Sequence, residues 1–201
     1  MSKIETRDFY VRSRNIADEL EAKYPARATI GEKMWMWSTA ENLPAGSIWV
    51  EIGTYRGWSA KIVADANPNI LVITIDPENT NRANALAKVW RGATNIAPIT
   101  AMSVCGADGN DTIRAVVDYI AHRDADVVYI DGDHSVEGVT ADIEHYEEIV
   151  KTGGILSGHD YNWIRKRMRR RSSRTTTAVT SWFEKNDRTI HNTERIWWAV
   201  M

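Results

Sequence analysis

Acidic and histidine side chains, the residue types that bind cations and transfer protons, gather in two short segments of the chain. The first is Asp131-Gly132-Asp133-His134 and the second is His159-Asp160-Tyr161. Each segment follows a run of apolar residues typical of a buried strand. Since the carboxyl ends of parallel strands meet at one edge of an open α/β sheet, we expect both clusters to converge on one rim. That rim is the predicted reaction end of a site.

A glycine-containing turn upstream is typical of a site for an adenosine cofactor. The strand Ser47–Ile52 runs into Gly53-Thr54-Tyr55-Arg56-Gly57-Trp58-Ser59. Gly53 permits a tight turn, and Gly57 lets the next helix begin against the strand, where its free N–H groups can receive a carboxylate. Asp76 ends the next strand, about where an acidic residue accepts both ribose hydroxyls of an adenosine cofactor.

Two details narrow the kind of cofactor. Glu51 is an acid in an otherwise apolar strand and needs a polar partner. The turn also lacks the middle glycine of the G-x-G-x-x-G loop that cradles a pyrophosphate, which disfavours NAD and hydride transfer. The alternative is an ordinary β–α turn followed by an exposed Asp76, and the flanking pattern disfavours that alternative.

Short β-branched runs alternate with longer helical patterns, which predicts an α/β fold built from β-α-β units around a mostly parallel sheet. The predicted strands are Ser47–Ile52, Ile70–Ile75, Asn95–Thr100, Ala125–Ile130, Gly154–His159, Thr189–His191 and Arg195–Val200. The clearest helix is Val136–Val150, with Ser135 as its N-cap. Only Asn192–Glu194 separates the last two strands, so they should form an antiparallel hairpin at one edge of the sheet.

The bulk properties of the 201 residues fit one domain with a single substantial core. A net charge of -2 at pH 7 gives no global sign that would favour nucleic acid or an anionic membrane as partner. A single cysteine, Cys105, rules out an intramolecular disulfide and fits a reducing compartment. No apolar run resembles a signal peptide or approaches a membrane span. We expect a cytoplasmic protein with no membrane partner, and the sequence is compatible with a homo-oligomer.

Three phrases of the sequence, IDGDHSVEGV, DIEHY and GGILSGHDY, resemble a widespread bacterial group of small-molecule methyltransferases that includes relatives of macrocin O-methyltransferase and cephalosporin hydroxylase. The E-x-G-x-x-x-G turn and the strand that ends in Asp76 resemble the first two motifs of class I S-adenosylmethionine-dependent methyltransferases. The likeness extends from about residue 47 to residue 161. It implies S-adenosylmethionine as cofactor and a Rossmann-like, seven-stranded, mostly parallel sheet with helices on both faces and an antiparallel terminal hairpin.

The resemblance also implies which residues bind the cofactor and how the chain is divided. The implied cofactor-binding residues are Glu51, Gly53, Thr54, Tyr55, Gly57, Ser59, Asp76, Ser103 and Asp131. Ser103 follows the third strand, where this fold usually contacts the adenine. Residues 1–45 are predicted to form a helical segment that packs on the core or over the acceptor site, and residues 46–201 form the Rossmann-like methyltransferase domain.

In metal-dependent O-methyltransferases of this broader kind, acids after the fourth and fifth strands help to hold a divalent ion that also takes two substrate oxygens. Asp131 and Asp160 match those positions, with Asp133 as a further carboxylate, and oxygen ligands favour magnesium over zinc. The resemblance thus implies that Asp131 and His134 are catalytic, with His134 removing the proton of a substrate hydroxyl. One departure is His159, which precedes Asp160 where the caffeoyl-CoA and catechol enzymes have an Asp-Asn pair. In the alternative interpretation Asp133 caps the helix, the histidines pack and hydrogen-bond, and only Asp131 touches ligand.

The predicted acceptor-binding residues are His159, Tyr161, Trp163 and Arg165. The segment Arg165–Arg174 holds seven basic residues in ten, either as an electropositive lid for an anionic acceptor or as a solvated loop. Nucleic acid stays open as an acceptor, RNA ribose in particular, but it is not favoured because the fourth strand lacks an N-P-P-Y-like motif for exocyclic amines. Trp35 and Trp37 either line the acceptor pocket or pack in the core.

We therefore predict a S-adenosylmethionine-dependent methyltransferase that acts on a hydroxyl of a small-molecule acceptor, with Mg²⁺ as a further cofactor in the metal-assisted form of the reaction. Two rival functions remain. A hydroxylase-like relative would use the acidic rim for iron. A noncatalytic module would sense the cofactor or hold a polyanion through Arg165–Arg174.

Overall fold

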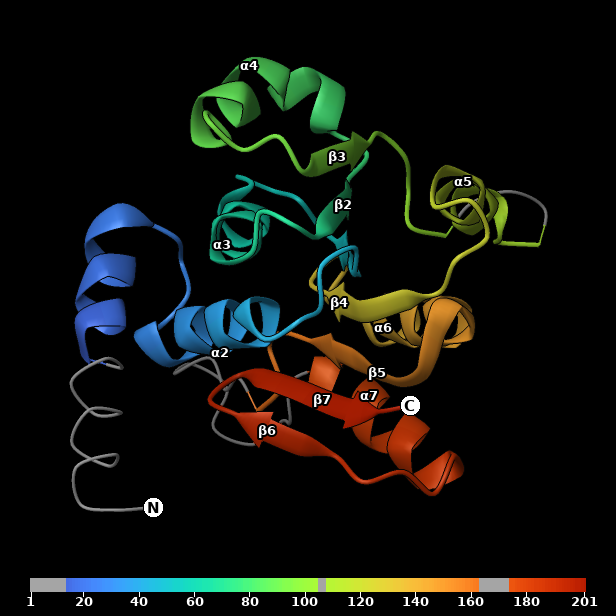
Figure 1. Ribbon diagram of the computed structural model, residues 1–201. Coiled ribbons are helices and arrows are strands. Elements are labelled where there is room, and N and C mark those ends of the chain that lie inside the picture. The colour runs from blue at the N-terminus through green and yellow to red at the C-terminus, as the bar shows by residue number, and fades with distance from the viewer. Residues whose placement is uncertain (1–13, 105–107, 163–173) are drawn as a thin grey trace.

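The computed structural model describes residues 14–104, 108–162 and 174–201, and in these residues one seven-stranded sheet has the order β3-β2-β1-β4-β5-β7-β6 (Figure 1). The strands are β1 (Ile48–Ile52), β2 (Leu71–Ile75), β3 (Ile96–Ile99), β4 (Ala125–Ile130), β5 (Val150–Gly158), β6 (His191–Thr193) and β7 (Ile196–Val200). Strands β1 to β5 are parallel, whereas β7 is antiparallel to both β5 and β6. This is the predicted α/β fold, with the strand order reversing beside β1, where open sheets bind ligands.

The terminal hairpin is confirmed, but its first strand was misplaced. The predicted strand Thr189–His191 lies two residues too early, because β6 spans His191–Thr193. Only Glu194 and Arg195 remain between β6 and β7, and Glu194 has a left-handed φ of 50°. This tight turn brings two charged residues to the edge of the site described below.

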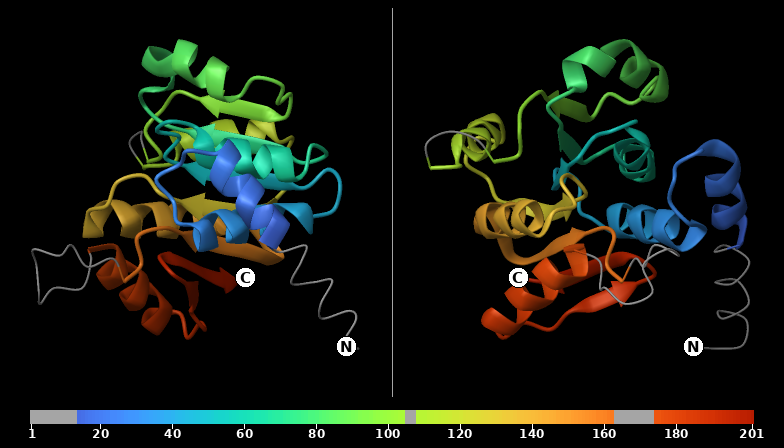
Figure 2. Two further views of the ribbon diagram at one scale, coloured as in Figure 1. Left: turned by 90° about the vertical axis from the view of Figure 1, so that its left-hand side faces the viewer. Right: turned by 180° about the vertical axis from the view of Figure 1, so that it is seen from behind.

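Helices cover both faces of the sheet (Figures 1 and 2). They are α2 (Ile30–Glu41), α3 (Trp58–Ala66), α4 (Asn79–Val89), α5 (Asp111–Tyr119), α6 (Val136–Tyr146) and α7 (Arg174–Lys185). One face carries α2, α3 and α4 and the other carries α5, α6 and α7. Residues 14–23 form a further helix beside α2, so the described part of the N-terminal segment is helical, as expected. In this described part of the chain, no helix is both long and apolar enough to span a bilayer.

The clearest predicted helix begins as expected but ends early. Ser135 is the N-cap of α6, and its hydroxyl oxygen accepts the backbone N–H of Gly138 at 2.9 Å. The prediction extended this helix to Val150. The helix instead ends at Tyr146, a short 3-10 turn spans Glu147–Ile149, and Val150 already begins β5. The apolar spacing of this segment continues past the end of the helix because Ile149, in the turn that follows, is also buried.

Alternate residues of the strands enter two cores. In β1, Ile48, Val50 and Ile52 belong to the core beneath α5, α6 and α7, and Trp49 belongs to the core beneath α2 and α3. Trp197 and Trp198 of β7 divide between the same two cores, because this strand is covered on both faces. Trp35 of α2 packs on Trp49, Tyr129 and Trp198, with ring centroids 5.7 to 6.3 Å apart. The N-terminal tryptophans therefore belong to the core.

Candidate active site

The turn after β1 lies tightly against the end of β4. Gly53 has a φ of 95°, and a Cβ at this position would collide with the carbonyl oxygen of Asp131. Gly57, with a φ of 73°, directly precedes α3, and its carbonyl oxygen accepts a hydrogen bond of 2.8 Å from Nε1 of Trp90. Both positions need glycine, because a side chain would meet strain as well as a neighbour. The backbone of the turn can therefore approach a ligand closely.

Glu51 is buried in β1 and is bonded to a chain of hydroxyl groups. The hydroxyl of Thr74 donates to Oε2 of Glu51 at 2.6 Å, and Oγ1 of Thr54 lies 2.7 Å from Oγ1 of Thr74. Since Thr74 donates its proton to the carboxylate, Thr54 must donate to Thr74. Burial raises the pKa of Glu51 to about 7, although hydrogen bonds from Ser59 and Thr74 oppose the rise. The polar partners expected for Glu51 are hydroxyls and not a cation.

Asp76 follows β2, and neighbours on three sides fix its carboxylate. Oδ2 accepts the backbone N–H of Tyr55 at 2.9 Å and lies 3.2 Å from Nη1 of Arg82. Oδ1 accepts the backbone N–H of Glu78 at 2.9 Å. The guanidinium of Arg82 also lies over the ring of Tyr55, 5.5 Å from its centroid. Asp76 is thus held beside the glycine turn, where an acid that binds a ribose is expected.

A cavity of about 350 Å³ borders both predicted halves of the site. Its wall includes residues 53–59 of the glycine turn, residues 25–28 before α2, Met36, Tyr129, Asp131, His134, His159, Asp160 and Arg195. Of the predicted cofactor-binding residues, Gly53, Thr54, Tyr55, Gly57, Ser59 and Asp131 are in this wall, whereas Glu51, Asp76 and Ser103 are not. The cofactor turn and the acidic rim, predicted separately, therefore face one space.

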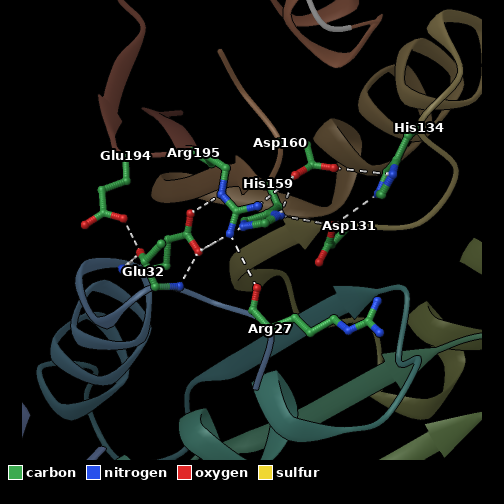
Figure 3. A network of polar contacts seen from close by, with 9 residues as sticks. Arg27, Glu32, Asp131, His134, His159, Asp160, Glu194 and Arg195 are labelled. Carbon is green, nitrogen blue, oxygen red and sulfur yellow. Dashed lines mark hydrogen bonds and ion pairs between the residues drawn. The ribbon is translucent and has the colours of Figure 1, made fainter. Parts of the chain in front are cut away.

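Two aspartates, Asp131 and Asp160, meet a histidine at the reaction end (Figure 3). We call them the aspartate pair. In His134, Nε2 lies 3.3 Å from Oδ1 of Asp131 and Nδ1 lies 3.4 Å from Oδ2 of Asp160. The contact with Asp131 raises the pKa of His134, although burial opposes it, and 51% of the side chain is exposed. Burial alone would raise the pKa of Asp131, but contacts with His134 and His159 outweigh burial and lower it.

His159 is buried between the aspartate pair and Glu32 (Figure 3). Its Nδ1 lies 3.1 Å from Oδ1 of Asp160 and 3.6 Å from Oδ1 of Asp131, and its Nε2 lies 3.3 Å from Oε2 of Glu32. Burial by itself lowers the pKa of His159, but the three carboxylates outweigh it and raise the pKa to about 11. Nε and Nη2 of Arg195 lie 2.7 and 2.8 Å from the two oxygens of Glu32. Burial opposes ionisation of Glu32, but His159 and Arg195 lower its pKa to about 2.

A family model described as a methyltransferase domain matches residues 50–161, which hold the glycine turn, Asp76 and both acidic segments. The chain belongs to the class I S-adenosylmethionine-dependent methyltransferases. A comparison with curated proteins finds no significant match.

Solved structures of other methyltransferases share the fold at low sequence identity. CalS11, a TDP-rhamnose 3'-O-methyltransferase of calicheamicin biosynthesis, is 11% identical with a TM-score of 0.61, over 100% of this chain and 95% of that chain. MycE of mycinamycin biosynthesis, in complex with Mg, SAH and mycinamycin VI, is 15% identical with a TM-score of 0.64, over 92% of this chain and 54% of that chain. The N-methyltransferase NodS from Bradyrhizobium japonicum is 14% identical with a TM-score of 0.54, over 83% of this chain and 91% of that chain. Since O- and N-methyltransferases share this fold, the acceptor atom must be argued from the site.

Three side chains of this methyltransferase have the spacing of metal ligands. One ligand atom each from Asp131, His134 and Asp160 lies within 4.8 Å of the other two. The two carboxylates suit a hard divalent cation and the imidazole suits a softer one, so the donor set fits a divalent ion. The third member is His134 and not the predicted Asp133. Oδ1 and Oδ2 of Asp133 accept the N–H and the hydroxyl of Ser135 at 2.9 and 2.7 Å, so this carboxylate is engaged at the start of α6 and the geometry gives no support to a metal role for it.

The remaining predicted residues lie elsewhere in this methyltransferase. The hydroxyl of Ser103 donates to Oδ1 of Asp142 at 2.5 Å, and its contact with an adenine stays a prediction. Tyr161 is half-buried and packs against the core, so its role with the acceptor also stays a prediction. Trp163, Arg165 and the basic segment as far as residue 173 lie outside the described residues.

Glu32 and Arg195 belong to the site of this methyltransferase, although the sequence did not point to either one. Thr29 and Glu32 form a capping box, in which Oγ1 of Thr29 accepts the N–H of Glu32 at 3.3 Å and Oε2 of Glu32 accepts the N–H of Thr29 at 2.8 Å. The T-x-x-E pattern predicts this helix start, but it does not predict a partner for a distant histidine. No sequence pattern around Arg195 indicates that it belongs to the site, since its contact with Glu32 joins residues 163 positions apart.

Proposed function

We propose that this protein transfers the methyl group of S-adenosylmethionine to a hydroxyl group of a small molecule. The observation that carries the proposal is that one cavity borders both the glycine turn after β1 and His134 with Asp131 after β4. A methyl donor bound at the turn and an acceptor bound beside His134 would share that cavity. Methyl transfer from a sulfonium disperses charge rather than creating it, so it depends chiefly on such positioning.

A base beside the acceptor favours a hydroxyl over an amine. A hydroxyl oxygen is a weak nucleophile until it loses its proton, whereas a neutral amine carries a free electron pair. His134 lines the cavity, and half of its side chain is exposed. When the exposed ring of His134 turns, its Nδ1 can exchange Asp160, 3.4 Å away, for the hydroxyl of an acceptor. Asp131 then stays in contact with the other nitrogen, Nε2. We assign His134 to take the acceptor proton and Asp131 to orient the ring.

His159 is a poor choice for that base. Its side chain is only 11% exposed, and both ring nitrogens face carboxylates at 3.1 to 3.3 Å. A group that already holds both protons between carboxylates has no electron pair to accept another proton. His159 therefore serves as a fixed cation beside the aspartate pair.

Asp131 and Asp160 are the residues that would hold a magnesium ion in this protein. Such an ion, when bound, polarises an oxygen of the acceptor and lowers the pKa of its hydroxyl. The support is the spacing of the ligand atoms, all within 4.8 Å of one another, and the preference of magnesium for carboxylate oxygens. Titration with Mn²⁺, followed by its electron paramagnetic resonance, should reveal a site that Asp160→Asn weakens and that Asp133→Asn leaves in place. Equal weakening by both variants would contradict this assignment.

Two arginines in the cavity wall support an anionic acceptor. Arg27 and Arg56 both line the cavity and are exposed. Within the described residues, neither guanidinium forms an ion pair with a carboxylate. Two probes of nearly equal size, 3,4-dihydroxybenzoate and 3,4-dihydroxybenzylamine, test whether the cavity prefers an anionic or a cationic acceptor. The benzoate should bind more tightly in calorimetry, and Arg27→Gln with Arg56→Gln should remove that preference; preference for the amine would contradict an anionic acceptor.

The cofactor assignment is tested by calorimetry with S-adenosylmethionine and with NAD. The wild-type protein should bind S-adenosylmethionine and not NAD. Asp76→Ala should weaken binding on the order of ten- to a hundredfold, the effect of removing a charged acceptor from two hydroxyl donors. Asp118→Ala, at an exposed position of α5, is the control and should bind as the wild type does. Preference for NAD, or equal affinity in the wild type and Asp76→Ala, would remove the cofactor assignment.

A further inference from the structure

Glu32 is a buried carboxylate with more partners than its local role requires. It is the third residue of α2 and is fully buried. As part of the capping box it needs only the backbone of Thr29. Its two oxygens also accept Nε and Nη2 of Arg195 at 2.7 and 2.8 Å, and Oε2 lies 3.3 Å from Nε2 of His159. A cap that faced solvent would stabilise the helix start equally well without burying a charge.

The partners of Glu32 link the N-terminal helix to the reaction end. The turn between β6 and β7 supplies Arg195, whose Nη2 also donates to the carbonyl oxygen of Arg27 at 3.4 Å (Figure 3). The end of β5 supplies His159. Neither Glu32 nor Arg195 lies in the segment 50–161 that carries the family likeness. Segments from both ends of the chain therefore meet at the one histidine that contacts both members of the aspartate pair through the same nitrogen.

We propose that Glu32 is a positioning residue of the reaction end. With Arg195 it fixes the ring of His159, and through that ring it holds the aspartate pair where His134 meets it. This inference rests on the proposed function of His134, but the contacts it concerns join residues of the chain itself.

Glu32 reaches the aspartate pair through its two partners: His159 contacts both aspartates, and Nη1 of Arg195 lies 3.7 Å from Oδ1 of Asp160. Glu32 has no contact with His134, whose own nitrogens face Asp131 and Asp160. The Nδ1 of His159 competes for the same carboxylates at 3.1 and 3.6 Å. If Glu32 no longer holds the opposite side of that ring, the ring can turn away from the aspartate pair. His134 then becomes the closest cation to both carboxylates, so its own environment must change.

Proton NMR of the unliganded protein labelled with ¹⁵N-histidine tests this relay. The ring signals of His134 and His159 are assigned from the spectra of His134→Gln and His159→Gln. In Glu32→Gln, the N–H of His159 that faces Glu32 should exchange with water on the order of tenfold faster or more, because a charge-assisted contact is lost. The ring signals of His134 should shift as well, although no atom of that residue touches Glu32.

The matched control is Asp65→Asn, which breaks another ionic contact of the N-terminal segment. Asp65, near the end of α3, pairs with Lys61 and Lys23 and accepts the hydroxyl of Tyr24 at 2.7 Å. None of these residues lines the cavity. Asp65→Asn should lower thermal stability and leave the spectra of both histidines unchanged.

One pattern overturns the proposal: Glu32→Gln loses stability as Asp65→Asn does, while His134 and His159 keep their wild-type spectra. Glu32 would then only attach α2 to the sheet. If Glu32→Gln does not fold, Arg195→Lys replaces it, since lysine keeps the charge but loses the two-pronged contact. It should shift both histidines in the same direction and by less, and unchanged signals would again overturn the proposal. Failure to bind S-adenosylmethionine would contradict the proposed function alone.

Discussion

Replacing Glu51 with glutamine should stabilise the protein above neutral pH and change little in acid. Glu51 is 1% exposed, and its burial raises its pKa from 4.5 to about 7. Between these two values the folded protein keeps a proton that the unfolded chain loses. The free energy of unfolding contributed by this group therefore falls as pH rises from 4.5 to 7 and stays low above 7.

The change in the free energy of unfolding follows from the pKa shift of Glu51. Each unit of pKa difference corresponds to about 1.4 kcal/mol, so the raised pKa of Glu51 lowers the free energy of unfolding by about 3 kcal/mol at pH 8, where the folded protein must ionise it. At pH 5 the loss is about 1 kcal/mol, because only the unfolded chain has given up the proton. Glutamine keeps an oxygen to accept the hydroxyl of Thr74, and its amide can donate to the hydroxyl of Ser59. Glu51→Gln should therefore gain about 3 kcal/mol over the wild type at pH 8 and about 1 kcal/mol at pH 5.

Urea unfolding at pH 5, 6, 7 and 8 measures this difference directly. Glu184→Gln, on the exposed side of α7, is the control and should follow the wild type at every pH. A difference between Glu51→Gln and wild type that does not vary with pH would show that Glu51 does not titrate in this range. A variant less stable than wild type at pH 8 would show that the hydroxyl chain requires the carboxylate.

Three further outcomes are expected. Gly57→Ala should lower the free energy of unfolding by about 2 kcal/mol or more, since strain at a φ of 73° adds to a collision with Trp90, whereas Gly92→Ala, with a φ of 83° and open space, should lose about 1 kcal/mol; equal losses in urea unfolding would contradict the packing at Gly57. Asp131→Asn should abolish methyl transfer but leave the affinity for S-adenosylmethionine within about threefold, because most of the proposed cofactor contacts come from the glycine turn; unchanged turnover would remove Asp131 from the mechanism. Burial opposes ionisation of Asp126, but Lys151 and the N–H of Ile48 lower its pKa, so it should contribute stability above its ordinary pKa that is lost as pH falls. Asp126→Asn should therefore make thermal unfolding less sensitive to acid.

The glycine turn after β1 was predictable because its signals are local. The turn from Gly53 to Gly57 requires particular backbone angles, and glycine at those positions records that requirement in the sequence. An acid that ends an apolar strand, as Asp76 does, is equally visible. The strands β1, β2 and β4 are buried on both faces, so their apolar runs mark them almost to the residue.

The elements that were misplaced lack such local signals. β6 is an exposed edge strand of three residues, His191–Thr193, with no apolar pattern to fix its position. The end of α6 was extended because Ile149, in the turn that follows it, is buried like the helix itself. Asp133 was predicted as a further metal ligand because of its place beside Asp131. In the structure its two oxygens accept the N–H and the hydroxyl of Ser135, so its metal role stays a prediction.

The charges of the reaction end support the different roles proposed for its two histidines. Glu32 and the aspartate pair place three carboxylates in a small buried volume, which is unfavourable unless cations balance them. Arg195 and His159 provide two fixed cations, and neither can give up its proton without leaving buried carboxylates unpaired. His134 is the exposed member of the cluster, so it can lose or gain a proton at a smaller cost in desolvation. The difference in burial therefore favours the proposed assignment, in which the buried His159 balances charge and the exposed His134 transfers the proton.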